Sequence, residues 1–225
     1  MKTSLSREEL FIYINKQINI FFPDEVQHVN FKEIVDLALS KVEYCFSFIS
    51  LKHYYKDGAI YFNHLNSDQY TVFIYYASNI AYEIYNDEKL ASKLFYLNKS
   101  FNQFHCMYST KLPDIFVLIH SSGIILGKAR YSDFLVVSHH CTVGANAELE
   151  YPKINKYTIM YPYSSIVGNS NIDPNVCLSN GAYINDEDID SNKIIFDRTP
   201  NLIIKNDKKN RIEYFFKNYR DINEK

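Results

Sequence analysis

Several features that would place this chain in a membrane, on an export route or on nucleic acid are missing from its sequence. No stretch approaches the roughly eighteen consecutive apolar residues that a membrane helix needs. The first residues, MKTSLSREELFIYINK, carry acids where a signal peptide would have an apolar stretch, so export is not expected. The net charge of −2 gives no general attraction to nucleic acid or to an anionic bilayer. We therefore expect no nucleic-acid partner and no stable insertion into a membrane.

Cysteine is sparse, and its spacing is unlike that of a disulfide framework. Only Cys45, Cys106, Cys141 and Cys177 occur, and no CxxC pair is among them. This usage favours reduced thiols and a cytoplasmic location. The sequence also has no Walker-type loop and no GxGxxG string, which leaves other nucleotide chemistry without support.

The residues that are present have an ordinary globular composition. Hydrophobic residues make up 47% and charged residues 22%, which excludes intrinsic disorder. A length of 225 residues suits one medium domain, or a small core domain with an appendage. The first part of the chain reads as helical, because apolar residues such as Leu10, Ile14 and Ile18 recur every three to four positions. We predict a helical domain over residues 1–108, with helices at 7–22, 31–48, 67–86 and 90–104.

From Pro113 onward the apolar residues recur every six positions. An aliphatic residue begins each repeat, and a small residue generally lies four positions later, as in Ile166 and Ser170. This pattern is typical of a parallel β-helix, in which each coil is a triangle of three short strands. The alternative, an α/β domain with accidental spacing, is disfavoured by the density of Asn, Ser, Pro and β-branched residues. The repeats start at Ile119, Ile125, Tyr131, Val137 and Val143, and then at Ile154, Met160, Ile166, Ile172, Leu178 and Ile184.

These two series are out of phase by five residues, 149–153. Because the period is intact on both sides, the insertion predicts a loop extruded from the stack, containing Glu150, Tyr151 and Pro152. Such a loop is either a tolerated insertion or one wall of a site. The overall prediction is an α+β chain: a helical domain, a β-helix over residues 109–205, and a basic C-terminal helix over residues 206–225 that covers the open end of the stack.

The order of these elements, with the strings IHSSGIILGKA, CTVGANAELEYPKI and YSSIVGNSNIDPN, resembles the hexapeptide-repeat acyltransferases. The resemblance is to the serine acetyltransferase-like branch, in which a helical domain precedes a left-handed β-helix with an extruded loop ending in His-Pro-Lys-Ile. The strings FNHLNSDQYTVF and LPDIF are similar to O-acetyltransferases of bacterial polysaccharide gene clusters. The resemblance covers about residues 60–205. Left-handedness rests on it alone, because general rules favour right-handed crossovers.

The resemblance implies that His120 is the general base, because His120 stands in the family's His-x-x-Gly-Ile string. Histidine suits this role because its side chain titrates near neutral pH. Asp114 precedes His120 by six residues, and we expect it one coil below, accepting the imidazole N–H; the alternative is that Asp114 caps the first coil. Ile119 and Tyr151 depart from the serine acetyltransferase pattern, which often has Asp and His at these two places. A two-histidine site and strict serine specificity are therefore not implied.

Further site residues also come from the resemblance. It implies acetyl-CoA as co-substrate, lying along a groove between adjacent prisms, with Arg198 and Lys205 facing its phosphates. The implied donor-site residues are Ser164, Gly168, Asn180, Gly181, Ala182, Arg198 and Lys205. For the acceptor we expect His64, Asp68, His139, Glu150 and Tyr151. His64 and Asp68 rest partly on the resemblance, whereas Glu150 and Tyr151 are ordinary sugar contacts. The alternatives are helix capping for Asp68 and a polar solenoid face for His139.

Three histidines, His120, His139 and His140, also raise the question of a zinc site. Adjacent residues of a strand point to opposite sides, so His139 and His140 are poorly placed to share a metal. We expect no metal cofactor.

The sequence thus predicts an acetyl-CoA-dependent O-acetyltransferase that modifies a sugar hydroxyl of a surface polysaccharide or its precursor. Serine O-acetyltransferase of cysteine biosynthesis is the alternative enzyme, and a non-catalytic β-helix used for assembly is an alternative of another class. We expect a homotrimer, because one prism offers a single wall for CoA and a second prism supplies the other.

Overall fold

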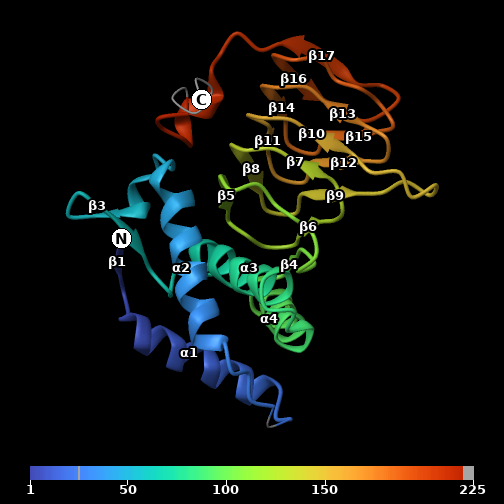
Figure 1. Ribbon diagram of the computed structural model, residues 1–225. Coiled ribbons are helices and arrows are strands. Elements are labelled where there is room, and N and C mark those ends of the chain that lie inside the picture. Colours follow the sequence, from blue (N-terminus) through green and yellow to red (C-terminus); the bar gives the residue numbers. More distant parts are fainter. Residues whose placement is uncertain (25, 220–225) are drawn as a thin grey trace.

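The computed structural model describes residues 1–24 and 26–219, which form a helical part and a stack of short strands (Figure 1). Within these residues we find no helix that is both long and apolar enough to cross a membrane.

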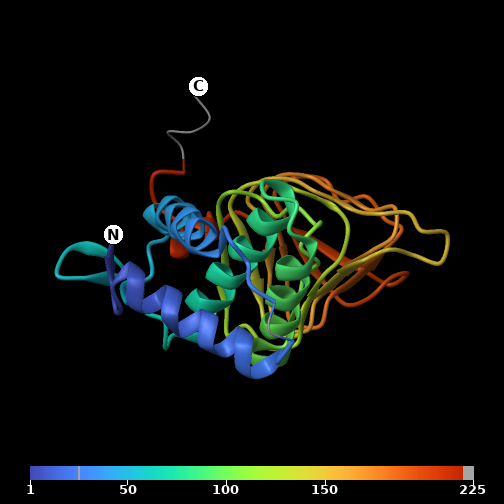
Figure 2. The same cartoon turned by 60° about the horizontal axis from the view of Figure 1, so that its bottom comes forward.

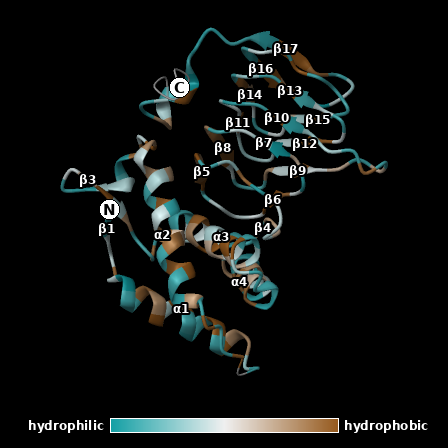
Figure 3. Ribbon diagram, in the orientation of Figure 1, coloured by the Kyte–Doolittle hydropathy of each residue, from teal (hydrophilic) through white to brown (hydrophobic). Residues whose placement is uncertain are grey.

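The helical part is built around a central helix, α3 (Ser67–Glu83), which is buried at twelve of its seventeen positions. It packs against α2 (Phe31–Ser47) and α4 (Glu88–Asn102), while α1 (Arg7–Phe21) lies outside them. In Figure 3, both α3 and α1 carry apolar residues interspersed with polar ones. A 3-10 helix, η1 (Lys52–Tyr54), and a small sheet were not predicted; the sheet holds β1 (Lys2–Thr3), β2 (Tyr55–Lys56) and β3 (Ala59–Phe62).

Local side-chain chemistry sets where these helices begin. The Ser6 hydroxyl accepts from the backbone N–H of Glu9, and the Glu9 carboxylate accepts from the N–H of Ser6. The side chain of Asn66 caps α3 by accepting from the N–H of Gln69. Asp68, in the first turn of α3, is therefore not the cap of its own helix, and its carboxylate is available for another part of the fold.

The rest of the chain is a parallel β-helix of about five coils with three faces. Figure 2 shows these coils as nested outlines beside the helices. The first face holds β5 (Phe116–Ile119), β8 (Leu135–Ser138), β11 (Ile159–Met160), β14 (Val176–Leu178) and β16 (Lys193–Phe196). The second face holds β4 (Phe104–His105), β6 (Ile124–Leu126), β9 (Thr142–Gly144), β12 (Ser165–Val167) and β15 (Tyr183–Asn185). The third face holds β7 (Arg130–Tyr131), β10 (Lys153–Ile154) and β13 (Asn171–Ile172).

The predicted repeat describes the core correctly except in the first coil. The repeat starts from Val137 to Ile184 point inward and are fully buried. Ile119 is only partly buried and Ile125 is 44% exposed, because Leu118 and Leu126 pair with the inward residues of the next coil instead. A six-residue period cannot locate this shift of one position, since another aliphatic residue adjoins each start: Leu118 precedes Ile119, and Leu126 follows Ile125.

The predicted extruded loop is present between β9 and β10, at residues 145–152 (yellow in Figure 1). Residues paired across the coil that contains the loop are 23 positions apart in sequence, as are Val136 and Ile159. In the next coil the paired residues are 18 positions apart, as are Ile159 and Cys177. The difference of five residues is the insertion that the phase shift indicated. The loop leaves the stack at the corner between the second and third faces.

The end of the stack differs from the prediction of a helix over 206–225. β17 (Ile203–Asn206) pairs antiparallel with β16, so Asn206 belongs to a strand. The chain then makes one 3-10 turn, η2 (Arg211–Tyr214), before Phe216 pairs with Ile49. This one turn is enough to bury Ile212 and Phe216. The helix does not continue, because Phe216 is extended and pairs with Ile49. The remainder of the predicted helix, residues 220–225, lies outside the described residues.

Candidate active site

His120 lies at the corner between the first and second faces, where the first coil has extra residues. Ile119 pairs with Ser138, nineteen positions on, but Ile125 pairs with Thr142, only seventeen positions on. The corner at His120 therefore holds two more residues than the corner above it. His120 is exposed there, with a left-handed backbone (φ 54°) that is unfavourable for a residue with a side chain. The protruding corner presents an imidazole to solvent at the rim of the β-helix.

Asp68 of α3, in the helical part of the chain, fixes this corner. Its two carboxylate oxygens accept from the backbone N–H of His120 (3.0 Å) and of Ser121 (2.6 Å). Hydrogen bonds to a charged acceptor are stronger than those between neutral groups. The buried Ser121 hydroxyl also lies 3.2 Å from the Thr71 hydroxyl of the same helix. Helix α3 thus holds the backbone of His120 and leaves its imidazole free.

Three aromatic side chains extend the site along the same corner of the stack. The rings of His139 and His120 are 6.3 Å apart between centroids, so the structure brings these two expected site residues together. His140 and Tyr163 stack on the next two coils, at 4.8 Å and 13°. Nδ1 of His139 is buried and has no hydrogen-bond partner within the described part of the chain. The corner therefore offers imidazole nitrogens next to a flat aromatic surface.

Asp114 does not lie beside His120, contrary to the expectation. Its carboxylate forms an ion pair with Lys41 at 2.9 Å, and its carbonyl accepts from the Tyr76 hydroxyl. The reason is geometric: six residues carry the chain across one face of the prism, whereas a coil needs eighteen. Asp114 and His120 sit at opposite ends of β5, about 20 Å apart along an extended chain. No side chain among residues 1–24 and 26–219 hydrogen-bonds the His120 imidazole.

His64, expected near the acceptor, faces the small N-terminal sheet instead. Its Nδ1 lies 2.7 Å from the Ser4 hydroxyl, and its ring packs edge-on against Tyr13. Burial lowers the pKa of His64 below its ordinary value, which favours the neutral ring. This packing gives His64 a structural role, in contact with Ser4 and Tyr13.

Glu150 and Tyr151 lie in the extruded loop, at the far end of the second face from His120. The Asn146 side chain organises this loop: its oxygen accepts from the N–H groups of Glu148 and Glu150, and its nitrogen donates to the Glu150 carboxylate. Lys128 lies 4.9 Å from the centre of the Tyr151 ring. Within one chain the loop and His120 therefore occupy different corners of the prism.

The seven residues expected to contact the donor fall into three groups. Ser164 and Ala182 are fully buried, and their backbone groups already bond within the coils, so they shape corners and are not accessible to a ligand. Gly168 is packed against Asp186 at the corner from which the loop leaves. The other four are exposed: Asn180 and Gly181 on the same corner as His120, Arg198 against Tyr183, and Lys205 against Phe196.

The cysteines are placed for packing and not for chemistry. All four are free and buried. Burial raises the pKa of Cys177 to about 12 and also raises that of Cys141, so neither thiolate is readily formed. In the part of the chain that the structure describes, no three His, Cys, Asp or Glu side chains are grouped so as to hold a metal ion.

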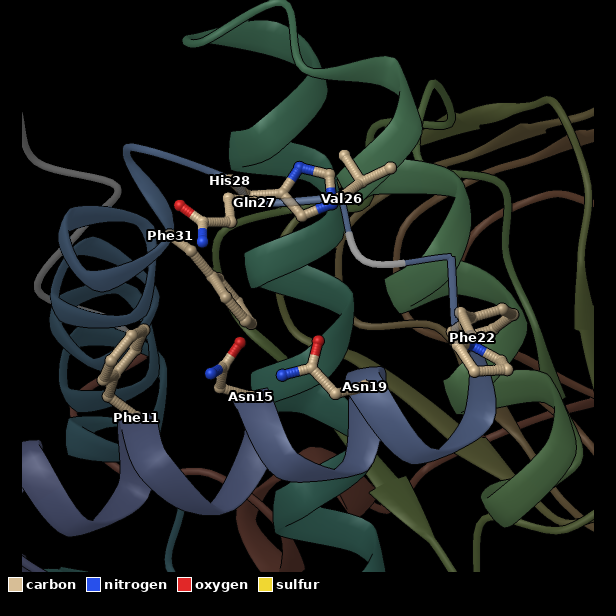
Figure 4. Close-up of a pocket in the computed structure, with 9 residues that line it drawn as sticks. Phe11, Asn15, Asn19, Phe22, Val26, Gln27, His28 and Phe31 are labelled. Carbon is tan, nitrogen blue, oxygen red and sulfur yellow. The ribbon is translucent and has the colours of Figure 1, made fainter.

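A cavity of about 730 Å³ lies in the helical part of the chain, between α1 and residues 22–23 and 26–31 (Figure 4). The amides of Asn15 and Asn19 point into it beneath the ring of Phe31. Nδ1 of His28, above them, lies 2.7 Å from the Asp87 carboxylate, just beyond the C-terminal end of α3. Asp68 and the His120 corner are at the N-terminal end of α3. Seventeen helical residues span about 25 Å, so this cavity is separate from the candidate active site.

The sequence did not identify three residues that build the His120 corner. Gln103 accepts from the Ser122 hydroxyl at 3.1 Å, Thr71 contacts Ser121, and Tyr163 stacks on His140. Gln103 and Thr71 come from other elements, so no spacing reveals them. Tyr163 could have been predicted from the sequence, because it lies 23 residues after His140, which is the length of the coil that contains the insertion.

Comparison with solved structures shows that the fold is that of left-handed β-helix acyltransferases. Serine acetyltransferase from Neisseria gonorrhoeae superposes with a TM-score of 0.62 at 17% identity, covering 81% of this chain and 73% of its own. Serine acetyltransferase in complex with coenzyme A from Brucella abortus gives 0.59 at 14% identity, covering 86% and 72%. Isoform 3 from Entamoeba histolytica, in complex with cysteine, gives 0.58 at 16%, covering 84% and 70%. No protein-family model and no curated protein sequence matches the chain.

Proposed function

We propose that this protein transfers an acetyl group from acetyl-CoA to a hydroxyl group, with His120 as the general base. The observation that carries the proposal is the exposed His120 imidazole on a corner whose backbone Asp68 holds in place. The fold shared with a coenzyme A-bound serine acetyltransferase supports the choice of donor.

The chemistry is a direct transfer between two bound substrates. The free imidazole nitrogen of His120 takes the proton of the acceptor hydroxyl as its oxygen attacks the thioester carbonyl. The C–S bond then breaks, and the proton passes to the departing sulfur, giving an O-acetyl ester and coenzyme A. No acyl-enzyme on Cys141 or Cys177 is involved, because burial keeps both thiols protonated.

The donor would lie along the corner above His120. Asn180 and Gly181 occupy the same corner higher in the stack, and their exposure lets a pantetheine arm approach. Arg198 and Lys205 are exposed cations in the last coils and would contact the nucleotide phosphates. The reducing environment suggested by four free cysteines agrees with a cytoplasmic enzyme.

For the acceptor, we propose a sugar hydroxyl of a surface polysaccharide or its precursor. A free amino acid needs a cation for its carboxylate, and residues 145–152 of the extruded loop include two glutamates but no lysine or arginine. Glutamate and tyrosine are ordinary sugar contacts, the first accepting from hydroxyls and the second stacking on a ring.

Serine is the second candidate acceptor, because several solved structures of similar fold are serine acetyltransferases, one of them in complex with serine. Lys128, next to Tyr151, is the cation that would take the serine carboxylate. The two acceptors are separated by comparing O-acetylserine formation with acetylation of a sugar panel. Faster acetylation of serine than of any sugar, lost in Lys128→Ala, would replace the first choice by the second.

We propose further that the active unit is a homotrimer in which the loop of one chain closes over His120 of the next. The separation of loop and His120 within one prism supports this arrangement. Light scattering should give three times the chain mass of 26.5 kDa. Co-refolding an inactive His120→Ala chain with an inactive Glu150→Ala/Tyr151→Ala chain should restore part of the activity, because a site can then draw on one intact part of each. An active monomer contradicts this assembly.

The general-base role is tested by thiol release from acetyl-CoA in the presence of the best acceptor. His120→Ala should lower turnover by about 10² to 10⁴ and leave coenzyme A binding nearly unchanged. His53, an exposed histidine of the helical domain, provides the matched control, and His53→Ala should have wild-type turnover. If wild type and His120→Ala release thiol equally slowly with every acceptor, the protein is a non-catalytic assembly module instead.

A further inference from the structure

A cavity of about 600 Å³ opens on the third face of the β-helix, away from the His120 corner. Its floor is formed by β7 and β10, which lie side by side with Arg130 paired to Lys153 (Figure 1). Its rim is residues 111–114, the segment that leads into β5. Asp114 belongs to this rim.

The cavity is lined by four cations, although the whole chain carries a net charge of −2. Lys111, Arg130 and Lys153 form no ion pair with any residue in the described ranges. The fourth, Lys156, has another interaction and is not needed for the argument. Two carboxylates face the same space: Asp114 is paired with Lys41, and Asp133 accepts from the N–H of Ile115. Positive charge therefore exceeds negative charge at this point.

The pairing of Arg130 with Lys153 puts two like charges on neighbouring strands, whose backbones are about 4.8 Å apart. Like charges directly opposite one another destabilise a sheet, and a concave site concentrates their field. An oxyanion between these side chains would remove the repulsion, and the guanidinium of Arg130 can hold a carboxylate or phosphate through two parallel hydrogen bonds. The arrangement of these two cations therefore favours a bound anion.

We propose that this basic cavity (Lys111, Arg130 and Lys153) binds the oxyanion of an acidic saccharide, either a sugar phosphate or a uronate. The polar groups beside the cations favour a saccharide over a simple ion: the Ser132 hydroxyl and the Asp133 carboxylate also line the cavity and can bond sugar hydroxyls. A cavity of 600 Å³ has room for more than one sugar unit. The proposal extends the proposed sugar acceptor by assigning it acidic groups, held at a site distinct from the reacting hydroxyl.

The test measures binding by isothermal titration calorimetry without acetyl-CoA, using glucose 1-phosphate, glucuronate, glucose and inorganic phosphate as probes. Wild type should bind at least one of the two acidic sugars, more tightly than it binds glucose or phosphate. Which of the two binds identifies the source of the oxyanion. Binding should weaken at least tenfold in Arg130→Gln/Lys153→Gln and also weaken with added salt. The matched control Lys16→Gln/Lys52→Gln removes two exposed lysines of the helical domain and should bind as wild type does.

The proposal is overturned if neither acidic sugar binds, or if either binds the Arg130→Gln/Lys153→Gln variant as well as wild type. Phosphate binding as tight as glucose 1-phosphate, without glucuronate binding, also overturns it, because the sugar is then not recognised. The His120→Ala variant should bind the acidic sugar normally. If the protein binds an acidic sugar but never releases thiol from acetyl-CoA, the proposed acetyltransferase activity is refuted, whereas the proposed binding site is supported.

Discussion

The contact of Asp68 with the His120 corner leads to a prediction that separates a positioning role from an acceptor-binding role. Asp68→Ala removes both acceptors for the N–H groups of His120 and Ser121. Hydrogen bonds to a charged group contribute about 1.5 to 3 kcal/mol each, and the half-buried position of Asp68 puts them at the lower end. The left-handed backbone of His120, which costs about 1 to 2 kcal/mol, would then have lost its main support. We expect the free energy of unfolding to fall by about 2 to 4 kcal/mol.

The same substitution should affect turnover through the position of the base. A displacement of about 1 Å can lower a rate about 10²-fold, so kcat should fall by that order while the KM of the acceptor stays within about threefold. Asp68→Asn keeps one acceptor oxygen and should recover part of both losses. Asp36→Ala, which removes one exposed ion pair with Arg7, should change stability by less than about 1 kcal/mol. Urea unfolding and steady-state thiol release measure these effects. A raised acceptor KM with unchanged kcat and stability would refute the positioning role and indicate direct contact with the acceptor.

Two further predictions concern backbone conformation and buried thiols. Gly168→Ala should destabilise the protein by about 1 to 3 kcal/mol in urea unfolding, because φ is +73° and a Cβ would lie 2.0 Å from Asp186 Oδ1. Gly144 has open space around it, so Gly144→Ala should change stability by less than about 1 kcal/mol. An equal effect of the two substitutions would contradict this reasoning. Burial raises the pKa of Cys45 and of Cys177 to about 12, above the value of about 8.5 for an unfolded thiol, so the free energy of unfolding should decline as pH rises from about 8.5 toward 12. Alkylation followed by mass spectrometry at pH 8.5 should label the native protein far more slowly than the urea-unfolded one, and fast labelling of native Cys177 would show that this thiol is accessible.

Periodic features of the fold were predictable from the sequence because they depend on neighbouring residues. The inward residues from Val137 to Ile184 follow a local rule of strand alternation and corner size, and the same rule located the five-residue loop. The rule gave Asp114 as a wrong partner for His120. A step of six residues crosses one face of the triangular coil, whereas a residue one coil below lies about eighteen positions away. The rule also missed the one-position shift at Ile119 and Ile125, where consecutive aliphatic residues satisfy either register.

Contacts between the helices and the β-helix could not be predicted from the sequence for a different reason. Asp68 and His120 are separated by 52 positions, and the capping signal at Ser67 and Asp68 gave the carboxylate an adequate local explanation. Only the observed cap, Asn66, shows that this carboxylate is free to bond elsewhere. The predicted C-terminal helix failed similarly, because Phe216 is held by a backbone pairing with Ile49, far away in sequence.

The reversal at β17 bears on how the molecule avoids uncontrolled growth. A stack of parallel coils ends in open strand edges, and another copy could add its own coil there in the same direction, giving a fibre. β17 runs against β16 and occupies the first-face edge of the last coil with a strand of opposite direction. A coil from a second molecule that ran in the direction of β16 would have to pair antiparallel with β17, so it could not continue the parallel ladder. The opposite direction of β17 thus disfavours end-to-end growth of the β-helix into a linear fibre.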